Sequence, residues 1–249
     1  MKLPNVKLPD VYTQMILTLF IFSLFGIYKY GIEKTVPQLA VAVITAAVLD
    51  IGIKYYKTKS FIIPKSAIIS GFFVALLLNI GQVWYIVALT AAIAVLSKHI
   101  LRLKGRHFFN PAGFAVLLSG LLLNVPQGWW GAENIPAILV LGVLILYRIK
   151  RFRMIISFLV AYFLLFFISK SFAISINAIL NPLILFFAFF MLTEHKTSPL
   201  FKKGMIIYGV LVGVLSFAFL YFNFMPSYFV LLALIIGNIV AWIMNWKAV

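Results

Sequence analysis

Residues 136–169, PAILVLGVLILYRIKRFRMIISFLVAYFLLFFIS, consist of two apolar runs separated by the basic segment RIKRFR at 148–153. Long apolar runs are typical of helices that lie in lipid. A cluster of Lys and Arg between two such runs is typical of a loop on the cytoplasmic side of a membrane. The stretch therefore predicts two membrane helices joined by an inner turn.

The same pattern extends along the whole chain of 249 residues. Apolar residues make up 64% of it and charged residues 10%, and the mean hydropathy is +1.12, whereas a soluble domain has about half apolar and a quarter charged residues. We expect an all-α polytopic membrane protein. Its ten transmembrane or half-membrane segments are residues 11–30, 35–53, 66–80, 83–97, 110–124, 136–149, 154–169, 181–193, 205–223 and 228–245.

Basic residues are sorted to one side when these segments are threaded alternately through a membrane. That side receives 18 of the 21 Lys and Arg residues, and the other side receives only Lys29, Lys34 and Lys170. The positive-inside rule then places the basic side, with both termini, on the cytoplasmic side of a cell membrane (the inner or cytoplasmic membrane). A net charge of +16 in a soluble protein would suggest nucleic acid. Here the charges are short clusters between hydrophobic runs, so we expect a lipid bilayer and no nucleic-acid partner.

The tryptophans fit the same threading. Trp84, Trp129 and Trp130 fall near the outer interface, and Trp242 and Trp246 fall near the inner one. Tryptophan is enriched at both membrane–water interfaces. We therefore expect all five in aromatic belts.

The ten segments divide at the loop 125–135 into a first repeat, 11–124, and a second repeat, 136–245, within a single membrane domain covering residues 1–249. An odd number of segments in each half means that related halves lie in opposite orientation, as in inverted-repeat transporters. Several segments have only about 13 to 16 residues, fewer than the roughly 20 of a full crossing. These are candidates for half-helices that end at a protein-lined cavity.

Two stretches carry more polar residues than the rest. In the first, 97–113, SKHILRLKGRHFFNPAG, a basic loop runs into Asn110 and Pro111, residue types that open a helix. The N–H groups of that first turn, beside Lys104, Arg106 and His107, would suit an anionic group such as phosphate. The alternative is an ordinary basic loop followed by an ordinary helix cap.

The second stretch is 181–199, NPLILFFAFFMLTEHKTSP. It opens with another Asn-Pro pair, on the outer side, and ends inside in a compact polar cluster. Glu194 is the only acidic residue after Glu133. The alternative here is a solvated pair of Glu194 with Lys196, worth less than about 1 kcal/mol.

Together these stretches resemble the family of membrane proteins that contains NqrB, from the sodium-pumping NADH:quinone oxidoreductase, and RnfD, from the Rnf complex. The matching pieces are SKH at 97–99, GRHFFNPA at 105–112 and FFMLTEHKTSP at 189–199. The last piece is similar to the family signature Phe-Met-x-Thr-Asp-Pro-x-Thr-Ser-Pro, although His195 stands where the family has proline. The resemblance covers nearly the whole chain.

The resemblance implies a urea-transporter-like inverted repeat and flavin-mediated electron transfer coupled to movement of Na⁺ or H⁺. It also implies partners, the other subunits of a membrane electron transport complex. The residues carried over as lining or supporting the flavin are Lys98, His99, Arg106, Asn110, Thr193, Glu194, Lys196 and Thr197. The family's attachment motif Ser-Gly-Ala-Thr is absent, and the nearest strings, at Ser70 and Ser119, lack its threonine. We therefore expect FMN or riboflavin to be bound noncovalently.

Elimination narrows the redox chemistry. The chain has no cysteine, and its three histidines, His99, His107 and His195, all fall on the inner side. This excludes thiolate-held clusters and a haem clamped by two histidines at depth, and no metal-ligand spacing is present. A nucleotide fingerprint is also missing, so the chain has no complete active site and no catalytic residue of its own.

Two polar residues within the segments are candidates for an ion pathway, Asp50 and Asn238. A membrane carboxylate is a default site for ion or proton handling. Alternatively, Asp50 pairs with Lys54 one turn on, and Asn238 lines a cavity or bonds a neighbouring helix.

Two further functions stay open beside the redox role. A small-solute channel or transporter of the same architecture needs no redox activity, because a fold does not fix a function. A scaffold subunit that has lost its cofactor fits the missing attachment motif.

Overall fold

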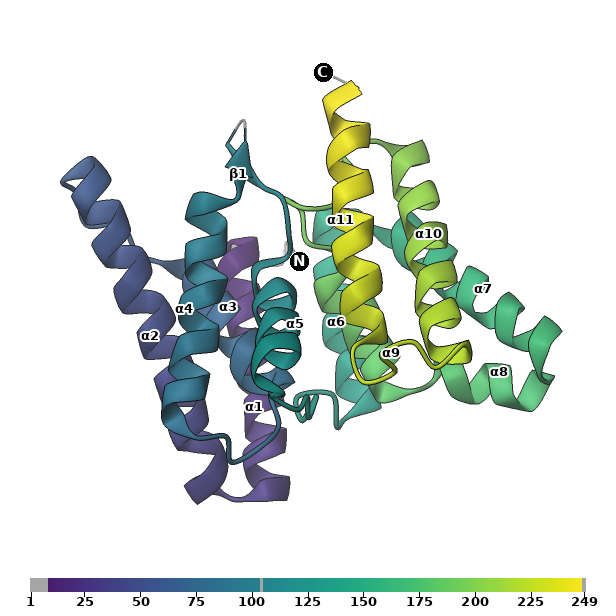
Figure 1. Ribbon diagram of the computed structural model, residues 1–249, viewed down its shortest axis with the longest axis horizontal. Coiled ribbons are helices and arrows are strands. Elements are labelled where there is room, and N and C mark those ends of the chain that lie inside the picture. Colours follow the sequence, from purple (N-terminus) through teal and green to yellow (C-terminus); the bar gives the residue numbers. More distant parts are fainter. Residues whose placement is uncertain (1–8, 104, 248–249) are drawn as a thin grey trace, which may run out of the picture.

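The computed structural model describes residues 9–103 and 105–247, and it is almost entirely helical (Figure 1). The helices are α1 (Val11–Tyr30), α2 (Ile32–Thr58), α3 (Lys65–Leu77), α4 (Trp84–Ile100), α5 (Pro111–Leu123), α6 (Ile135–Ile149), α7 (Phe152–Ser169), α8 (Phe172–Ile179), α9 (Pro182–Phe186), the π-helix η1 (Phe187–Met191), α10 (Lys202–Tyr221) and α11 (Phe229–Lys247). Two short antiparallel strands, β1 (Arg102–Leu103) and β2 (Arg106–His107), form a hairpin between α4 and α5.

Each of the ten predicted segments coincides with a helix, with α9 and η1 together forming one. Within the described residues, five helices are long and apolar enough to cross a membrane: α1, α2, α7, α10 and α11. The bent pair formed by α8 and the following α9–η1 is a sixth candidate, and α3, α4, α5 and α6 are shorter apolar helices. The chain is therefore a multi-pass, all-α membrane protein. Helix α8 and the hairpin were not predicted.

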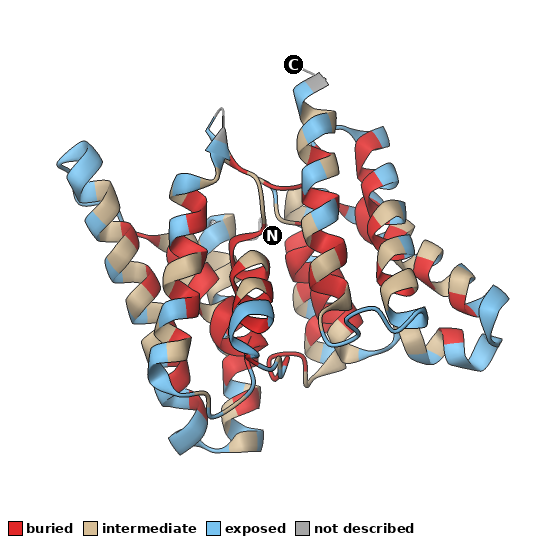
Figure 2. Ribbon diagram, in the orientation of Figure 1, coloured by how far each residue is buried: buried red, intermediate tan, exposed pale blue. Residues whose placement is uncertain are grey.

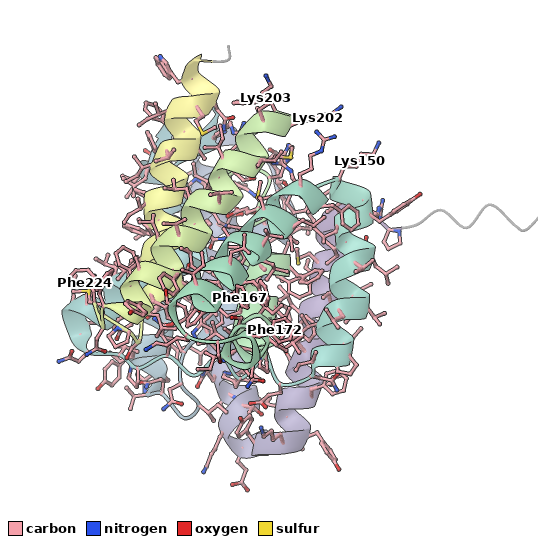
Figure 3. All side chains as sticks on the ribbon, turned by 90° about the vertical axis from the view of Figure 1, so that its right-hand side faces the viewer. Lys150, Phe167, Phe172, Lys202, Lys203 and Phe224 are labelled. Carbon is pink, nitrogen blue, oxygen red and sulfur yellow. The ribbon has the colours of Figure 1, made fainter. Side chains whose placement is uncertain are left out.

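The helix ends gather at two ends of the molecule, and several basic side chains lie at one of them. Figure 3 shows Lys150, Lys202 and Lys203 at this end, while Phe167, Phe172 and Phe224 lie toward the other. The hairpin and the C-terminus are also at the lysine-rich end (Figure 1). We call it the charged end. The loops that carry Lys150, Lys202 and Lys203, which were predicted to lie on one side of the membrane, are together at this end.

The burial pattern is that of a protein surrounded by lipid. Buried residues are concentrated in the inner helices and exposed residues on the outward faces (Figure 2). Large apolar side chains such as Leu17, Leu122 and Ile168 are exposed. The innermost element is α9–η1, where every residue from Ile184 to Leu192 is buried. A helix that is apolar on all sides is expected in such a position.

Helix α3 is only 13 residues long and ends inside the protein. Its last carbonyls would be unpaired in lipid, which is unfavourable by several kcal/mol for each group. The loop after α5 supplies the donors: Trp130 Nε1 donates to Ala75 O at 2.7 Å, and Gly128 N donates to Leu77 O at 2.9 Å. Gln38 Nε2 from α2 adds a second bond to Ala75 O at 2.9 Å.

This arrangement corrects the expected outer aromatic belt. Trp129 and Trp130 are 7% and 1% exposed, so they lie in the core and not at an interface. The indole of Trp130 packs so closely on α1 that a Cβ on Gly26 would lie 2.2 Å from its ring. Trp84, by contrast, is exposed as expected.

Close backbone packing joins α7 to α10. A Cβ on Gly209 would lie 2.4 Å from Met154 O and 2.1 Å from Ser157 Oγ. We predict that Gly209→Ala lowers the free energy of unfolding by about 1–3 kcal/mol, because the helices must separate to admit the methyl group. Thermal unfolding of the detergent-solubilised protein measures this.

Gly52→Ala in α2 is the matched control, since no atom lies within 4 Å of the added Cβ. It should be neutral or stabilise the helix by up to about 1 kcal/mol. Equal effects of the two substitutions would contradict the packing argument.

Candidate functional site

The predicted polar cluster forms where the chain leaves η1, at the charged end. His107 Nε2 lies 2.9 Å from Glu194 Oε1, and Thr197 Oγ1 donates to Glu194 Oε2 at 3.3 Å. Ser198 Oγ donates to the Glu194 carbonyl oxygen at 2.6 Å. Glu194 is therefore bonded within a compact turn, 193–199, and among the described residues its ion-pair partner is His107 and not Lys196.

Two arginines hold this turn through its backbone. Arg106, on β2, donates to the carbonyl oxygens of His195 at 2.8 Å, Lys196 at 3.0 Å and Ser198 at 3.3 Å. Arg151, which precedes α7 and is 2% exposed, donates to Ser198 Oγ at 3.1 Å and to the Pro199 carbonyl. A guanidinium group presents five donors in a planar fork, which suits several carbonyls at once.

His195 completes this cluster and is held neutral. Its Nδ1 accepts a hydrogen bond from Arg151 at 2.8 Å, which requires an unprotonated nitrogen. Burial, with further contributions from Arg151, Arg106 and Lys196, lowers the pKa of His195 below its ordinary value of 6.5.

A buried amide junction joins the two halves of the chain next to the turn. Asn238 Oδ1 on α11 accepts from Asn110 N at 2.8 Å, and Asn238 Nδ2 donates to Tyr208 Oη at 2.9 Å and to Thr197 O at 3.4 Å. Asn110 is the N-cap of α5, as predicted, and its Oδ1 accepts from Gly113 N at 2.9 Å. Since these N–H groups are already bonded, the first turn of α5 does not present the row of free donors that we expected for an anion.

A second polar group lies between α2, α3 and α4. Asp50 is 2.6 Å from Lys54 Nζ and 2.9 Å from His99 Nε2. Lys98, which is 8% exposed, donates from Nζ to Ser66 O at 2.7 Å and to Ser66 Oγ at 3.1 Å. The pairing with Lys54 that we considered as an alternative is therefore present, and the ion-pathway role of Asp50 stays a prediction.

A cavity of about 380 Å³ opens between the halves beside the turn. Its walls come from α1, α3, α6, the start of α5 and the end of η1. The lining residues are Val11, Tyr12, Met15, Ser66, Ile69, Ser70, Phe73, Asn110, Pro111, Ala112, Ile145, Arg148, Ile149, Phe190, Thr193, Glu194, His195 and Lys196. We call this the main cavity, and most of its wall is apolar.

A smaller cavity of about 100 Å³ adjoins it, and Ser66 and Lys196 line both. Its other lining residues are Asp50, Lys54, Lys98, His99, Arg102, Gly105 and His107. The described residues contain no group of three His, Asp or Glu that could hold a metal ion.

The predicted site residues thus divide between four places. Asn110, Thr193, Glu194 and Lys196 line the main cavity, and Lys98, His99 and again Lys196 line the smaller one. Arg106 and Thr197 line neither cavity and bond to the turn. Asn238 lies in the amide junction and bonds to Tyr208 on the neighbouring helix α10, which was one of the two alternatives to an ion-pathway role.

Sequence reasoning missed Arg148, Arg151 and Ser66. Arg148 lines the main cavity and donates to Gln14 Oε1 at 3.1 Å. All three lie at the ends of apolar segments, where basic and small polar residues are ordinary. Ser66 lies in the first turn of α3, Arg148 in the last turn of α6 and Arg151 directly before α7, so no sequence signal set them apart.

Comparison with known families decides the wider relationship. A model of the NQR2, RnfD, RnfE family matches residues 4–123 and, in a second match, residues 117–248. The chain belongs to this family. The resemblance read from residues 97–112 and 189–199 is therefore confirmed. Comparison with curated proteins finds no match.

Membership of the NQR2, RnfD, RnfE family makes the chain a membrane subunit of the Rnf/Nqr type, and its helices agree with that. Both matches together run from the start of α1 to the end of α11. The cavities and the turn therefore lie in the part of the chain that the family shares.

We predict that His195 makes stability depend on pH. In the unfolded chain, His195 is protonated near pH 6.5, whereas in the folded chain it is protonated only at a lower pH. Neutral His195 therefore contributes its full stability above about pH 6.5, the ordinary pKa of histidine. This stability is lost as the pH falls from there through the lower pKa of the folded chain. Lowering the pH from about 7.5 to about 5 should lower the unfolding temperature.

His195→Gln should shrink this decrease, because the Gln amide oxygen can still accept from Arg151 and does not titrate. Thermal unfolding of both proteins across this pH range is the measurement. The same pH dependence in both would show that His195 is not the group responsible.

Proposed function

We propose that the chain is the flavin-binding membrane subunit of an Rnf/Nqr-type electron transport complex and couples electron transfer to movement of Na⁺ or H⁺. The main cavity between the two halves carries this proposal. Its volume of about 380 Å³ lies within the roughly 300–1,000 Å³ of small-molecule sites. Ile69, Phe73 and Phe190 form apolar walls for a planar ring, and Glu194 and Ser66 supply polar groups at its rim.

A flavin would bring the redox chemistry, and the chain's residues would bind and orient it. The Glu194 carboxylate is fixed by His107 and Thr197, so it can accept a hydrogen bond from a ligand without first being ordered. The apolar walls exclude water from the ring. Ser70, which begins one of the two Ser-Gly strings, also lines the cavity, but no threonine follows it. Binding would therefore be noncovalent.

An inverted repeat is part of the proposal. Helix α1 packs on α6, and α5 packs on α11. These are the first and the fifth of the predicted segments in each half, so each packs on its own counterpart, as is expected of helices next to a two-fold axis between the halves. The two family matches, one over each half, give further support.

The proposal places the charged end on the cytoplasmic side of a cell membrane. Because the chain has no cysteine, single cysteines can report sidedness. We predict that Lys34→Cys is labelled by an impermeant maleimide in intact cells, whereas Lys203→Cys is labelled only after permeabilisation. The reverse pattern would overturn the orientation, and labelling of both in intact cells would overturn the topology.

Flavin binding is tested by filling the cavity. Ile145 lines it, and its neighbour Leu144 on α6 is 52% exposed on the outer surface. We predict that Ile145→Trp lowers the flavin released by acid precipitation of the purified protein about fivefold or more, because the indole occupies the ring's space. Leu144→Trp is the matched control and should leave the flavin content unchanged.

Monodisperse elution of both variants checks that the loss is not unfolding. Flavin retained by a folded Ile145→Trp protein would exclude this cavity. Colourless wild-type protein that co-purifies with redox subunits would instead favour the scaffold role.

One observation bears on the rival function of a solute channel. A third cavity, of about 580 Å³, lies at the opposite end, and Trp129 lines it. Phe186 lies between the two cavities, with ring centroids 6.1 Å from Phe73 and 6.4 Å from Trp129. Phe22 packs on it at 5.4 Å. This aromatic layer lies between the two cavities and opposes passage of a solute from one to the other. Solute uptake by vesicles that contain the chain alone would favour the channel function.

A further inference from the structure

Helix α2 extends beyond its neighbours at the charged end, where its last turns stand apart from α4 (Figure 1). Every residue from Tyr55 to Ile63 is exposed (Figure 2). This segment contains the end of α2 at Thr58 and most of the loop that leads to α3. It lines neither the main cavity nor the smaller one. We call residues 55–63 the α2 tip.

The α2 tip carries two cations, Lys57 and Lys59. Lys54, one turn earlier, pairs with Asp50. Among the described residues, by contrast, no salt bridge involves Lys57 or Lys59. The ammonium group of Lys59 lies 5.3 Å from the centre of the Tyr56 ring, which attracts the cation without neutralising it. The tip therefore has a positive charge for which the described part of the chain supplies no counter-ion.

The backbone reverses direction at these lysines. Lys59 has a φ of 55°, and its N–H donates to the Tyr55 carbonyl at 2.8 Å, so α2 ends here in a left-handed cap. Thr58 Oγ1 lies 2.8 Å from Ser60 Oγ within the same turn. The reversal places Lys57 and Lys59 where the segment turns back toward α3.

Aromatic and apolar side chains flank the two lysines on both sides. Tyr55 and Tyr56 precede them, and residues 61–63, Phe-Ile-Ile, follow, and all of these side chains are exposed. Leaving large apolar side chains in water is unfavourable. Aromatic rings are enriched at the membrane–water interface, and lysine extends its charge from there toward the headgroups. The α2 tip therefore has the composition of a segment that lies in this interface.

We propose that the α2 tip binds the anionic headgroups of phospholipids at the membrane surface of the charged end. Charge complementarity selects this partner, because a headgroup such as that of phosphatidylglycerol has a net negative charge to offset Lys57 and Lys59. A zwitterionic headgroup has none. The apolar side chains on both sides of the lysines favour lipid over an acidic protein surface, since lipid supplies headgroups and acyl chains at neighbouring depths.

One face of α2 marks where such a lipid would lie. Gly52, Tyr56 and Lys59 follow one another at spacings of four and three residues, so they share this face. Gly52 is exposed, and no atom lies within 4 Å of a Cβ added there. A lipid with its headgroup at Lys59 would place its acyl chains along Gly52. A probe at Gly52 can therefore report the bound lipid without touching the α2 tip.

The test uses the full chain with Gly52→Cys, which then holds its single cysteine, labelled with a fluorophore and reconstituted in bilayers. Quenching by phospholipids with brominated acyl chains reports which lipid lies beside the probe. Brominated phosphatidylglycerol and brominated phosphatidylcholine are compared at equal mole fraction. Phosphatidylglycerol should be preferred about fivefold or more, because each lysine near an anionic surface contributes a factor of about five.

Two double variants of the labelled chain localise the effect. Lys57→Gln with Lys59→Gln should reduce the preference to about twofold or less, because the cations that select the headgroup are lost. Lys202→Gln with Lys203→Gln is the matched control, since it removes the same charge from two exposed lysines of α10 at the same end. It should keep the preference. Salt at about 1 M, where the Debye length is about 3 Å, should abolish the preference of the parent chain.

Three results would overturn the proposal. Equal quenching by both lipids in the parent chain would show that no headgroup is selected. An equal loss of preference in both double variants would assign the selection to the overall charge of this end and not to the α2 tip. A probe that neither lipid quenches would mean that a second copy of the chain or another protein covers this face of α2.

Discussion

The turn 193–199 depends on two guanidinium groups that reach it from different halves of the chain. Arg106 comes from the hairpin of the first half and Arg151 from the start of α7 in the second, and both donate to backbone carbonyls or to Ser198. A polar turn at the end of a buried helix has carbonyls that lipid cannot satisfy. The arginines satisfy them and thereby fix Glu194 at the edge of the main cavity and Lys196 at the edge of both cavities.

Backbone satisfaction also explains the short helices. Helix α3 stops after 13 residues because the loop at 126–130 and Gln38 provide donors for its terminal carbonyls. Helix α5 starts late because Asn110 caps it and Asn238 closes the cap from α11. The main cavity lies along α3 and beside the first turn of α5.

Hydropathy and charge were sufficient to predict the ten segments, the caps at Asn110 and Asn181, and the gathering of polar residues at one end. They could not predict partners far apart in the sequence. An arginine in a loop between apolar segments has the same local sequence whether it is solvated or bonded to a carbonyl 48 residues away, as Arg151 is. Trp130 likewise lies in a loop whose sequence suggests a membrane interface, yet its indole N–H donates to the Ala75 carbonyl in the core.

The length of α2 sets the depth at which one of these clusters sits. Its 27 residues rise about 40 Å, against about 30 Å for the hydrocarbon layer. If Ile32 marks one hydrocarbon boundary and the helix stands upright, Asp50 lies about 27 Å along the axis and Lys54 about 33 Å. The carboxylate then sits just inside the boundary where acyl chains give way to headgroups, with its lysine just outside. A thicker bilayer would submerge this pair, so the membrane's own thickness would bear directly on its ionisation.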